Sequence, residues 1–310
     1  MFKRGFSIDQ AALQRIFDAH GLGQVNTVEW AGLGRNNPAL IINDALVIRF
    51  DGIINEGVSR FHGEARAYAA LNAAGVPAPR ALLVDDSAAL VPQHYVIMTK
   101  LEGAPLIQAW PTLTPAQREG AAYQAGELLA KMHGIPFERF GRLYGTERIF
   151  GTWREYLEDY LSRATREAAN DGLIPPDLLT RTEAAMARHA PLLDAVTTPR
   201  LVHWDYHFEN LLYKDGAITG VLDFEWALGG DPAHDFNRRD QWDEDCPGSR
   251  APLYAGYISL RPLDSDHEAR AALYQMLWYV DCVIDAFDDA EAELFRGRLA
   301  AVLEKLVQRG

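Results

Sequence analysis

One stretch of the chain, residues 203–225, restricts the possible folds more than any other. It opens with His203-Trp204-Asp205, reaches Asn210 after a short loop, and ends in an apolar strand that stops at Asp223-Phe224-Glu225. Asp215-Gly216 lies between two short apolar runs and predicts a tight hairpin turn. Such a hairpin would bring Asp205, Asn210 and Asp223 to the same end of a rigid ribbon.

These three side chains form the set that phosphoryl transfer requires. One carboxylate, Asp205, can receive the proton of an attacking hydroxyl group. An amide and a second carboxylate, Asn210 and Asp223, can hold Mg²⁺. We therefore predict Asp205 as the catalytic residue and Asn210 and Asp223 as the metal ligands.

The longer pattern resembles a known group of enzymes. H-x-D-x-x-x-x-N is followed by Val221-Leu222-Asp223-Phe224-Glu225-Trp226-Ala227 and then by Gly230-Asp231-Pro232 and Asp235. This combination resembles the aminoglycoside phosphotransferase and choline kinase group of small-molecule kinases. Glu225 stands where protein kinases carry the glycine of D-F-G, so the resemblance is not to protein kinases themselves. We interpret Asp231 and Asp235 as carboxylates that brace the loop rather than bind metal.

The resemblance covers nearly the whole chain and is strongest across residues 201–238. It implies an α+β, two-lobed, protein-kinase-like fold. Residues 1–101 would form a small β-rich lobe that binds the nucleotide, and residues 102–310 a larger α-helical lobe for catalysis and acceptor binding. It also implies ATP or GTP as the phosphoryl donor and Mg²⁺ as the cofactor.

The same resemblance assigns residues to the nucleotide. Arg49, on the predicted strand 45–50, would touch the α- and β-phosphates, and Glu64 on the predicted helix 56–73 would pair with it. Arg departs from the lysine that kinases usually carry here, but its planar fork can hold a phosphate and a carboxylate together. Gly32 and Gly34 would let backbone N–H groups approach the phosphates. Met98, Thr99 and Leu101 would lie near the adenine, at the hinge between the lobes.

Further segments read as regular structure. Ser7 and Gln10 predict a capping box for a helix over 7–20, and Thr114-Pro115-Ala116-Gln117 predicts another that ends before Gly134. Strands are expected over 24–30, 39–42 and 93–99. Additional helices are expected near 153–169, 176–188, 268–286 and 290–308.

Acidic and aromatic residues late in the chain predict the charge of the acceptor. Trp278, Asp281 and Asp285 are three and four residues apart and share one helix face. Together they suit a cationic, hydroxyl-bearing acceptor such as an aminoglycoside or another amino alcohol. Asp243 and Glu244, in the acidic run 240–245, are predicted to contribute to the same pocket. A solvated acidic helix with Trp278 packed inward is the other interpretation.

Composition excludes several classes of protein. The 30 basic and 43 acidic residues give a net charge of −13, which argues against nucleic-acid binding. No window reaches the apolar length of a membrane span, and no apolar signal segment opens the chain. Two cysteines, Cys246 and Cys282, fit a reducing cytoplasm. Oligomeric state cannot be inferred.

The sequence therefore predicts a Mg²⁺-dependent phosphotransferase that moves the γ-phosphate of ATP or GTP to a hydroxyl group of a small molecule. Two alternatives stay open. Arg49 in place of lysine is the one feature that favours a catalytically silent nucleotide-binding protein. His203, Asp205 and His207 could instead line a zinc hydrolase site, although that site would leave Asn210 unexplained.

Overall fold

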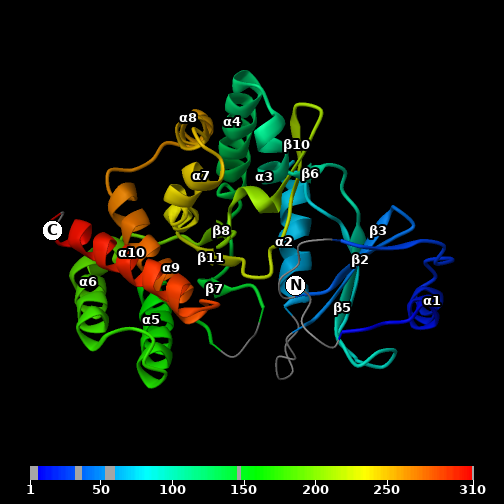
Figure 1. Cartoon of the computed structure of the whole chain (residues 1–310), viewed down its shortest axis with the longest axis horizontal. Helices are drawn as coiled ribbons and strands as arrows, with labels where there is room; N and C mark the ends of the chain where they lie inside the picture. The colour runs from blue at the N-terminus through cyan, green and yellow to red at the C-terminus, as the bar shows by residue number, and fades with distance from the viewer. Residues whose placement is uncertain (1–5, 32–36, 53–59, 145–147, 309–310) are drawn as a thin grey trace.

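The computed structural model describes residues 6–31, 37–52, 60–144 and 148–308. A β-sheet with helix α1 (Gln10–Ala19) lies at one end of the molecule, and most of the helices lie at the other (Figure 1). This is the predicted kinase-like arrangement of an N-terminal antiparallel sheet followed by a largely helical part. Gly32 and Gly34 fall outside the described residues.

The N-terminal sheet has five antiparallel strands in the order β1-β2-β3-β5-β4. Their bounds are β1 Val28–Trp30, β2 Ala39–Ile42, β3 Leu46–Phe50, β4 Ala81–Asp85 and β5 Tyr95–Thr99. Asn43 and Asp44 join β2 to β3 with φ of 54° and 55°, values that two-residue hairpin turns require. A tight turn thus connects the two strands at these residues.

Strand alternation decides which way Arg49 points. On β3, Ile48 and Phe50 face the cluster that α1 covers, together with Tyr95 and Ile97 of β5. Arg49 lies between Ile48 and Phe50, so it faces the opposite side of the sheet. Helix α2 (Phe61–Ala73) covers that side and carries Glu64 in its first turn.

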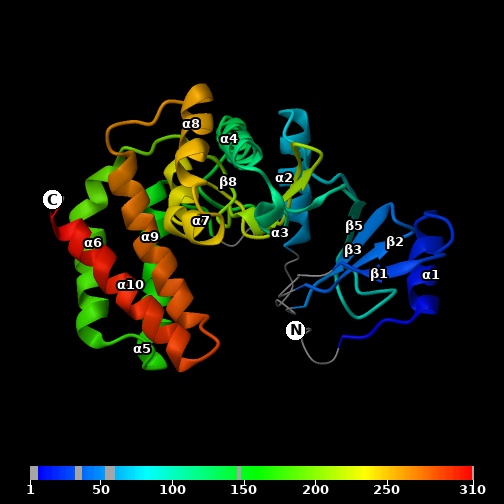
Figure 2. The ribbon, with the colours of Figure 1, turned by 45° about the horizontal axis from the view of Figure 1, so that its top comes forward.

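The remaining elements form the C-terminal part, whose helices are seen from a second side in Figure 2. Two small sheets of three strands each, in the orders β10-β9-β6 and β7-β11-β8, support the loops of the site. The strands are β6 Ala104–Pro105, β7 Gly141–Arg142, β8 Arg200–Val202, β9 Leu211–Lys214, β10 Ala217–Val221 and β11 Leu228–Gly230. The helices are α3 Leu106–Ala109, α4 Pro115–Met132, α5 Trp153–Asn170, α6 Pro176–Asp194, α7 Arg239–Asp245, α8 Arg250–Leu260, α9 His267–Ile284 and α10 Asp289–Gln308.

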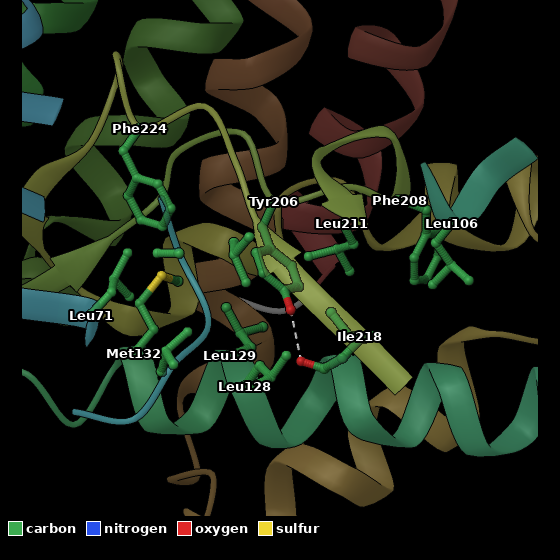
Figure 3. Close-up of a cluster of buried hydrophobic side chains, with 14 of the residues drawn as sticks. Leu71, Leu106, Leu128, Leu129, Met132, Tyr206, Phe208, Leu211, Ile218 and Phe224 are labelled. Carbon is green, nitrogen blue, oxygen red and sulfur yellow. Dashed lines mark hydrogen bonds between the residues drawn. The ribbon is translucent and has the colours of Figure 1, made fainter. Parts of the chain in front are cut away.

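A continuous apolar cluster lies beneath residues 203–225. Figure 3 shows Tyr206, Phe208 and Phe224 from these loops packed with Leu71 of α2 and with side chains of α4. The Tyr206 hydroxyl donates a hydrogen bond of 2.7 Å to the Ala125 carbonyl of α4 (Figure 3). The loops that carry the candidate site are therefore packed on the apolar core.

Most of the predicted elements are present, and the errors lie at helix ends. The capping box at Thr114 is confirmed, with Gln117 as its partner. The capping box at Ser7 is wrong, because Asp9 caps α1 and accepts from the Ala12 N–H. The short helices α7 and α8 were not predicted. In the described part of the chain, no helix is both long and apolar enough to cross a membrane.

Two glycines allow α4 and α8 to approach backbone to backbone. A Cβ atom on Gly126 would lie 1.9 Å from the Leu253 carbonyl oxygen, and one on Gly256 would lie 2.0 Å from the Tyr123 carbonyl oxygen. Neither neighbour can move aside without shifting a helix. We predict that Gly126→Ala destabilises the protein by about 1–3 kcal/mol, although alanine is the better helix former.

Gly120, also in α4, is a matched control because a Cβ atom there meets nothing within 4 Å. Gly120→Ala should raise the free energy of unfolding by up to about 1 kcal/mol. Urea unfolding of both variants measures the difference. Equal effects at the two positions would contradict the close helix contact.

Candidate active site

A buried carboxylate, Asp235, holds the loop that contains the predicted catalytic residue. It accepts hydrogen bonds from the backbone N–H groups of His203 (2.8 Å) and Trp204 (2.7 Å), and the His133 ring Nε2 lies 2.9 Å away. Burial alone would raise the pKa of Asp235, but the hydrogen bond from His133 and the nearby histidines outweigh burial and lower it. The prediction that Asp235 braces the loop is confirmed.

Asp205 follows Trp204, whose φ of +77° is unusual for a large side chain. One oxygen of the Asp205 carboxylate, Oδ1, forms an ion pair with Arg238, and the other, Oδ2, lies 3.5 Å from His207 Nε2. Burial would raise the pKa of Asp205, but the Arg238 charge, with help from His207, lowers it well below its usual range. Asp205 is therefore an ionised carboxylate at neutral pH.

Two hydrogen bonds at Leu222 connect the Asp205 loop to the Asp223 loop. His203 Nε2 lies 2.8 Å from the Leu222 carbonyl oxygen, and the Leu222 N–H donates 2.8 Å to the Asn210 carbonyl oxygen. His203 Nδ1 accepts from the Asp205 N–H at 3.2 Å. Both ring nitrogens of His203 are thus engaged, which removes it from the alternative zinc site. The hairpin predicted at Asp215-Gly216 is present between β9 and β10.

Arg49 lies at the centre of three carboxylates. Its Nη1 is 2.5 Å from Glu64 Oε1, and its Nη2 is 3.2 Å from Asp223 Oδ1 and 3.6 Å from Glu225 Oε2. The predicted contact between Arg49 and Glu64 is therefore present. The Tyr68 hydroxyl donates 2.6 Å to Glu64 and accepts from the Asp223 N–H at 3.2 Å. This network joins α2 and β3 to the loop after β10.

Asn210 and Asp223 fit a magnesium ion. The Asn210 amide nitrogen donates 3.0 Å to the Asp205 carbonyl oxygen, so the amide oxygen is oriented as an acceptor. The side chain of Asp223 is 38% exposed, unlike the fully buried Glu64. Burial and the Asp223 charge raise the pKa of Glu225 to about 7, a sign that one guanidinium does not balance three carboxylates. A hard divalent cation would relieve this excess of negative charge. No group of three or more His, Cys, Asp or Glu among the described residues is arranged to hold a metal alone.

The predicted adenine contacts lie at the end of β5. Met98 is 3% exposed and packs in the core under α2. Thr99 Oγ1 accepts from the Arg80 N–H at 2.9 Å. Leu101 packs against β10, where a Cβ atom on Gly220 would lie 2.6 Å from Leu101 Cδ1. Contact of these three residues with a base stays a prediction.

Asp281 of α9 lies near the Asp205 loop through Tyr160, whose ring centroid is 5.2 Å from that of Trp204. Asp281 accepts a hydrogen bond from the Tyr160 hydroxyl, and burial raises its pKa to about 7. Asp285, at the C-terminal end of α9, is exposed. Trp278 is 7% exposed, and the cation over its ring is Arg238, whose guanidinium carbon lies 4.8 Å from the ring centroid. Trp278 therefore packs inward, as the other interpretation expected, and it supports Arg238.

Asp243 and Glu244 are paired within the protein. Asp243 Oδ2 lies 2.9 Å from Arg250 Nε, and Glu244 Oε2 lies 3.0 Å from Arg298 Nη2. Their charges are already neutralised, so these contacts do not support the predicted role in acceptor binding. The member of the acidic run with electrostatic neighbours in the catalytic loop is Asp245, which interacts with His207.

A column of aromatic and cationic side chains was not predicted. The Trp204 ring stacks on His234 (4.0 Å between centroids, 17° between planes). The Arg142 guanidinium carbon lies 3.9 Å from the Trp204 centroid and 5.1 Å from the Trp226 centroid. Arg60, at the start of α2, lies 3.9 Å from the Trp226 centroid. The signal in the sequence was weak. Trp204, Trp226 and His234 lie within the recognised motifs, but the cations Arg60 and Arg142 do not.

The sequence is similar to a known protein family and to individual relatives. A family model described as "Phosphotransferase enzyme family" matches residues 34–301. The chain is 25% identical over 251 residues to Acyl-CoA dehydrogenase family member 11 of Gallus gallus, and 29% identical over 209 residues to homoserine kinase of Gluconacetobacter diazotrophicus. These matches cover 76% and 64% of this chain but 31% and 60% of the relatives, so the chain spans less than two thirds of either relative.

Solved structures share the fold. A candidate fructosamine-3-kinase from Thermobifida fusca superposes with a TM-score of 0.74 at 20% identity, covering 97% of this chain and 99% of that one. Aminoglycoside phosphotransferase APH(4)-Ia, in a ternary complex with AMP-PNP and hygromycin B, gives a TM-score of 0.69 at 17% identity, covering 94% and 98%. At these identities the likeness concerns the fold.

We predict that Asp235→Asn destabilises the protein by about 2–5 kcal/mol, because two buried N–H groups lose their ionic acceptor. The control is Asp194→Asn. Asp194 is an exposed carboxylate 3.2 Å from Arg154, and its loss should change stability by about 1 kcal/mol or less. Urea unfolding compares the two variants, and equal effects would contradict the bracing role of Asp235.

Proposed function

Because the chain belongs to the phosphotransferase enzyme family, we propose that it transfers the γ-phosphoryl group of ATP to a hydroxyl group of a small, positively charged amino alcohol. One observation carries this proposal. Hydrogen bonds at Leu222 hold the loop of Asp205 and Asn210 against the loop of Asp223. Asp223 in turn contacts Arg49, which pairs with Glu64.

Asp205 orients the acceptor hydroxyl group. It is ionised at neutral pH because the Arg238 charge outweighs the effect of burial and lowers its pKa. A carboxylate held in this state accepts a hydrogen bond from the hydroxyl group and takes its proton late, as the oxygen–phosphorus bond forms. Phosphoryl transfer proceeds through a loose transition state and needs little earlier deprotonation.

Arg49 binds the phosphates while Glu64 holds it in place. Asn210 and Asp223 would hold Mg²⁺, which when bound neutralises charge on the β- and γ-phosphates. We place the nucleotide between residues 1–101 and 102–310, with Gly32 and Gly34 over the phosphates and Met98, Thr99 and Leu101 near the adenine. GTP is the alternative donor.

The acceptor is cationic because the Asp281 carboxylate has no cationic partner in the described part of the chain that would stabilise its ionised form. In the described part of the chain, its carboxylate has no Lys, Arg or His nitrogen within ion-pair distance and receives a hydrogen bond from Tyr160. Burial of this carboxylate raises its pKa to about 7. A substrate ammonium group would restore the ionised form and form a charge-assisted hydrogen bond. Asp285, one helical turn later, extends the same acidic face.

The substrates named for similar proteins support an acceptor of this class. Homoserine, fructosamines and the aminoglycoside hygromycin B all combine an amine with hydroxyl groups. A thermal-shift screen of such compounds with Mg²⁺ and ATP would find binders, because a specific ligand raises the melting temperature by mass action.

We predict that Asp205→Asn lowers turnover by roughly 10²–10⁴-fold while nucleotide affinity stays close to that of the wild type. The carboxylate faces the acceptor rather than the nucleotide. Release of ADP in the presence of the best acceptor measures turnover, and calorimetry measures nucleotide binding. Wild-type turnover in this variant would remove Asp205 from its catalytic role.

Asp223→Ala provides the contrast, because Asp223 belongs to the metal and nucleotide side. It should weaken Mg²⁺-dependent nucleotide binding and turnover together. If Mg²⁺ dependence and rate were unchanged, Glu225 would be the better candidate for the metal ligand. Nucleotide binding by the wild type without turnover of any hydroxylated compound would favour the catalytically silent alternative.

We predict that the KM for a cationic acceptor rises as the pH falls below about 7, the pKa of Asp281. Above that pH the carboxylate is ionised and binds the ammonium group, and below it the carboxyl is neutral. Asp281→Asn should raise the KM roughly 10–100-fold at pH 8, as expected for a lost hydrogen bond to a charged group, and should remove the pH dependence.

The matched control is Glu304→Gln, because Glu304 is an exposed carboxylate on α10. This variant should leave the KM unchanged. Neutral sugars and hydroxy acids should be poorer acceptors for the wild type than amino alcohols. A clear preference for the neutral or anionic compounds would overturn the cationic acceptor. An unchanged KM in Asp281→Asn would exclude this helix from the acceptor pocket.

A further inference from the structure

Arg238 makes three contacts that together fix its guanidinium group. It lies just before α7, and its Nη2 forms the ion pair with Asp205 Oδ1. Its Nη1 donates 2.9 Å to Gln241 Oε1. Its guanidinium carbon lies 4.8 Å from the centroid of the Trp278 ring on α9.

This ion pair differs from the surface pairs of the protein. The side chains of Arg238 and Asp205 are 18% and 23% exposed, whereas those of the surface pair Arg154 and Asp194 are 40% and 53% exposed. Screening by water weakens exposed pairs and leaves partly buried pairs stronger. The Arg238–Asp205 pair can therefore determine where the carboxylate sits.

Trp278 is a rigid support for Arg238. It is 7% exposed and packs against Tyr279 (5.1 Å between ring centroids) and Phe295 of α10 (6.3 Å). A planar guanidinium over an aromatic ring gains cation–π energy and loses rotational freedom. The support thus runs from α10 through α9 to Arg238 and then to Asp205.

The ion pair also distinguishes the two oxygens of the Asp205 carboxylate. Oδ1 faces Arg238 and is buried, whereas Oδ2 lies 3.5 Å from His207 Nε2 and is the oxygen that can also meet an acceptor hydroxyl group. Rotation of the carboxylate would break the ion pair. Asp205 is therefore held in a single orientation before the acceptor binds.

We propose that Arg238, supported by Trp278, is a positioning residue for the transfer reaction: it holds the Asp205 carboxylate so that Oδ2 faces the acceptor hydroxyl group. This inference rests on the proposed function. Arg238 does not contact the nucleotide side, where Arg49, Asn210 and Asp223 lie. Its loss should therefore lower kcat and leave nucleotide binding intact.

The test compares Arg238→Met, Arg238→Lys and Arg238→Ala with the wild type, using the best acceptor from the screen. Arg238→Met keeps an unbranched apolar stem but removes the guanidinium charge, and it should lower kcat by about 10²-fold, the usual effect of a misplaced catalytic group. Nucleotide Kd should stay within about twofold of the wild type, well below the tenfold change that marks a lost contact. Arg238→Lys should recover part of the loss because the charge returns without the planar fork.

Chemical rescue separates positioning from a general structural role. Methylguanidinium should restore part of the turnover of Arg238→Ala by filling the vacated space over Trp278. The control is Arg250, which pairs with Asp240 (2.8 Å) and Asp243 (2.9 Å) away from Asp205. Arg250→Ala should keep wild-type turnover and show no response to methylguanidinium.

Trp278 gives an independent measurement in case Arg238 variants fold poorly. Trp278→Phe keeps an aromatic ring and should retain most of kcat, whereas Trp278→Leu should lower it. Combined with Arg238→Ala, Trp278→Leu should also weaken the rescue by methylguanidinium. Unchanged kcat in Arg238→Met, a loss that parallels nucleotide Kd, or equal rescue of Arg250→Ala would each overturn the inference. If the wild type and Asp205→Asn both lacked turnover, the proposed function itself would have failed. If only the Arg238 series behaved like the wild type, the positioning role alone would have failed.

Discussion

The buried carboxylate of Asp235 is the constraint on which the rest of the site depends. Removing a charge from water is costly unless several donors replace the lost hydration, and here two consecutive backbone N–H groups and a histidine ring do so. Because both N–H groups must point at one carboxylate, the backbone at Trp204 takes a left-handed conformation. That conformation turns the chain so that Asp205 emerges next to Arg238, while the His203 ring reaches Leu222. One buried charge thus helps to set the relative positions of the two loops that carry the proposed catalytic and metal-binding residues.

At the other side of the site, an imbalance of charge prepares the protein for phosphate and metal. One guanidinium, Arg49, contacts three carboxylates that come from α2 and from the loop after β10. The planar fork explains why arginine can replace the usual lysine. Nη1 contacts Glu64 while Nη2 contacts Asp223. The single, compact ammonium group of a lysine is less suited to contact two separate carboxylates at once. The same ion cluster joins the N-terminal sheet to the C-terminal part, so the residues proposed to bind the nucleotide also hold the two parts in contact.

The sequence was sufficient for features that depend on local rules. Asp215-Gly216 predicted the hairpin. The pairing of Arg49 with Glu64 came instead from the resemblance to the small-molecule kinases. Contacts between residues far apart in the chain could not be predicted. Arg238 lies in a segment without periodicity, and nothing local indicates that its guanidinium reaches Asp205. The helix cap at Asp9 was missed for another reason: Ser7 and Asp9 are both good caps, and only the packing of α1 on the sheet decides between them.

The acidic residues illustrate why composition alone cannot locate a cation site. The chain carries 43 acidic and 30 basic residues, so carboxylates outnumber the cationic side chains that could pair with them. The run 240–245 stands out because it contains several carboxylates. A carboxylate is available to a ligand only if no arginine of the same chain neutralises it, and Asp243 and Glu244 fail this condition. Its affinity for a cation also grows with desolvation, since a buried charge without a partner is unstable. Asp281 comes nearest to both conditions: it is partly buried beside Tyr160, and in the described part of the chain no arginine forms an ion pair with it, although the nearby charges of Arg142 and Arg238 act to lower its pKa. The proposed selectivity for a charged acceptor therefore rests on one carboxylate without an ion-pair partner in the described part of the chain, and the net negative charge would contribute mainly long-range attraction.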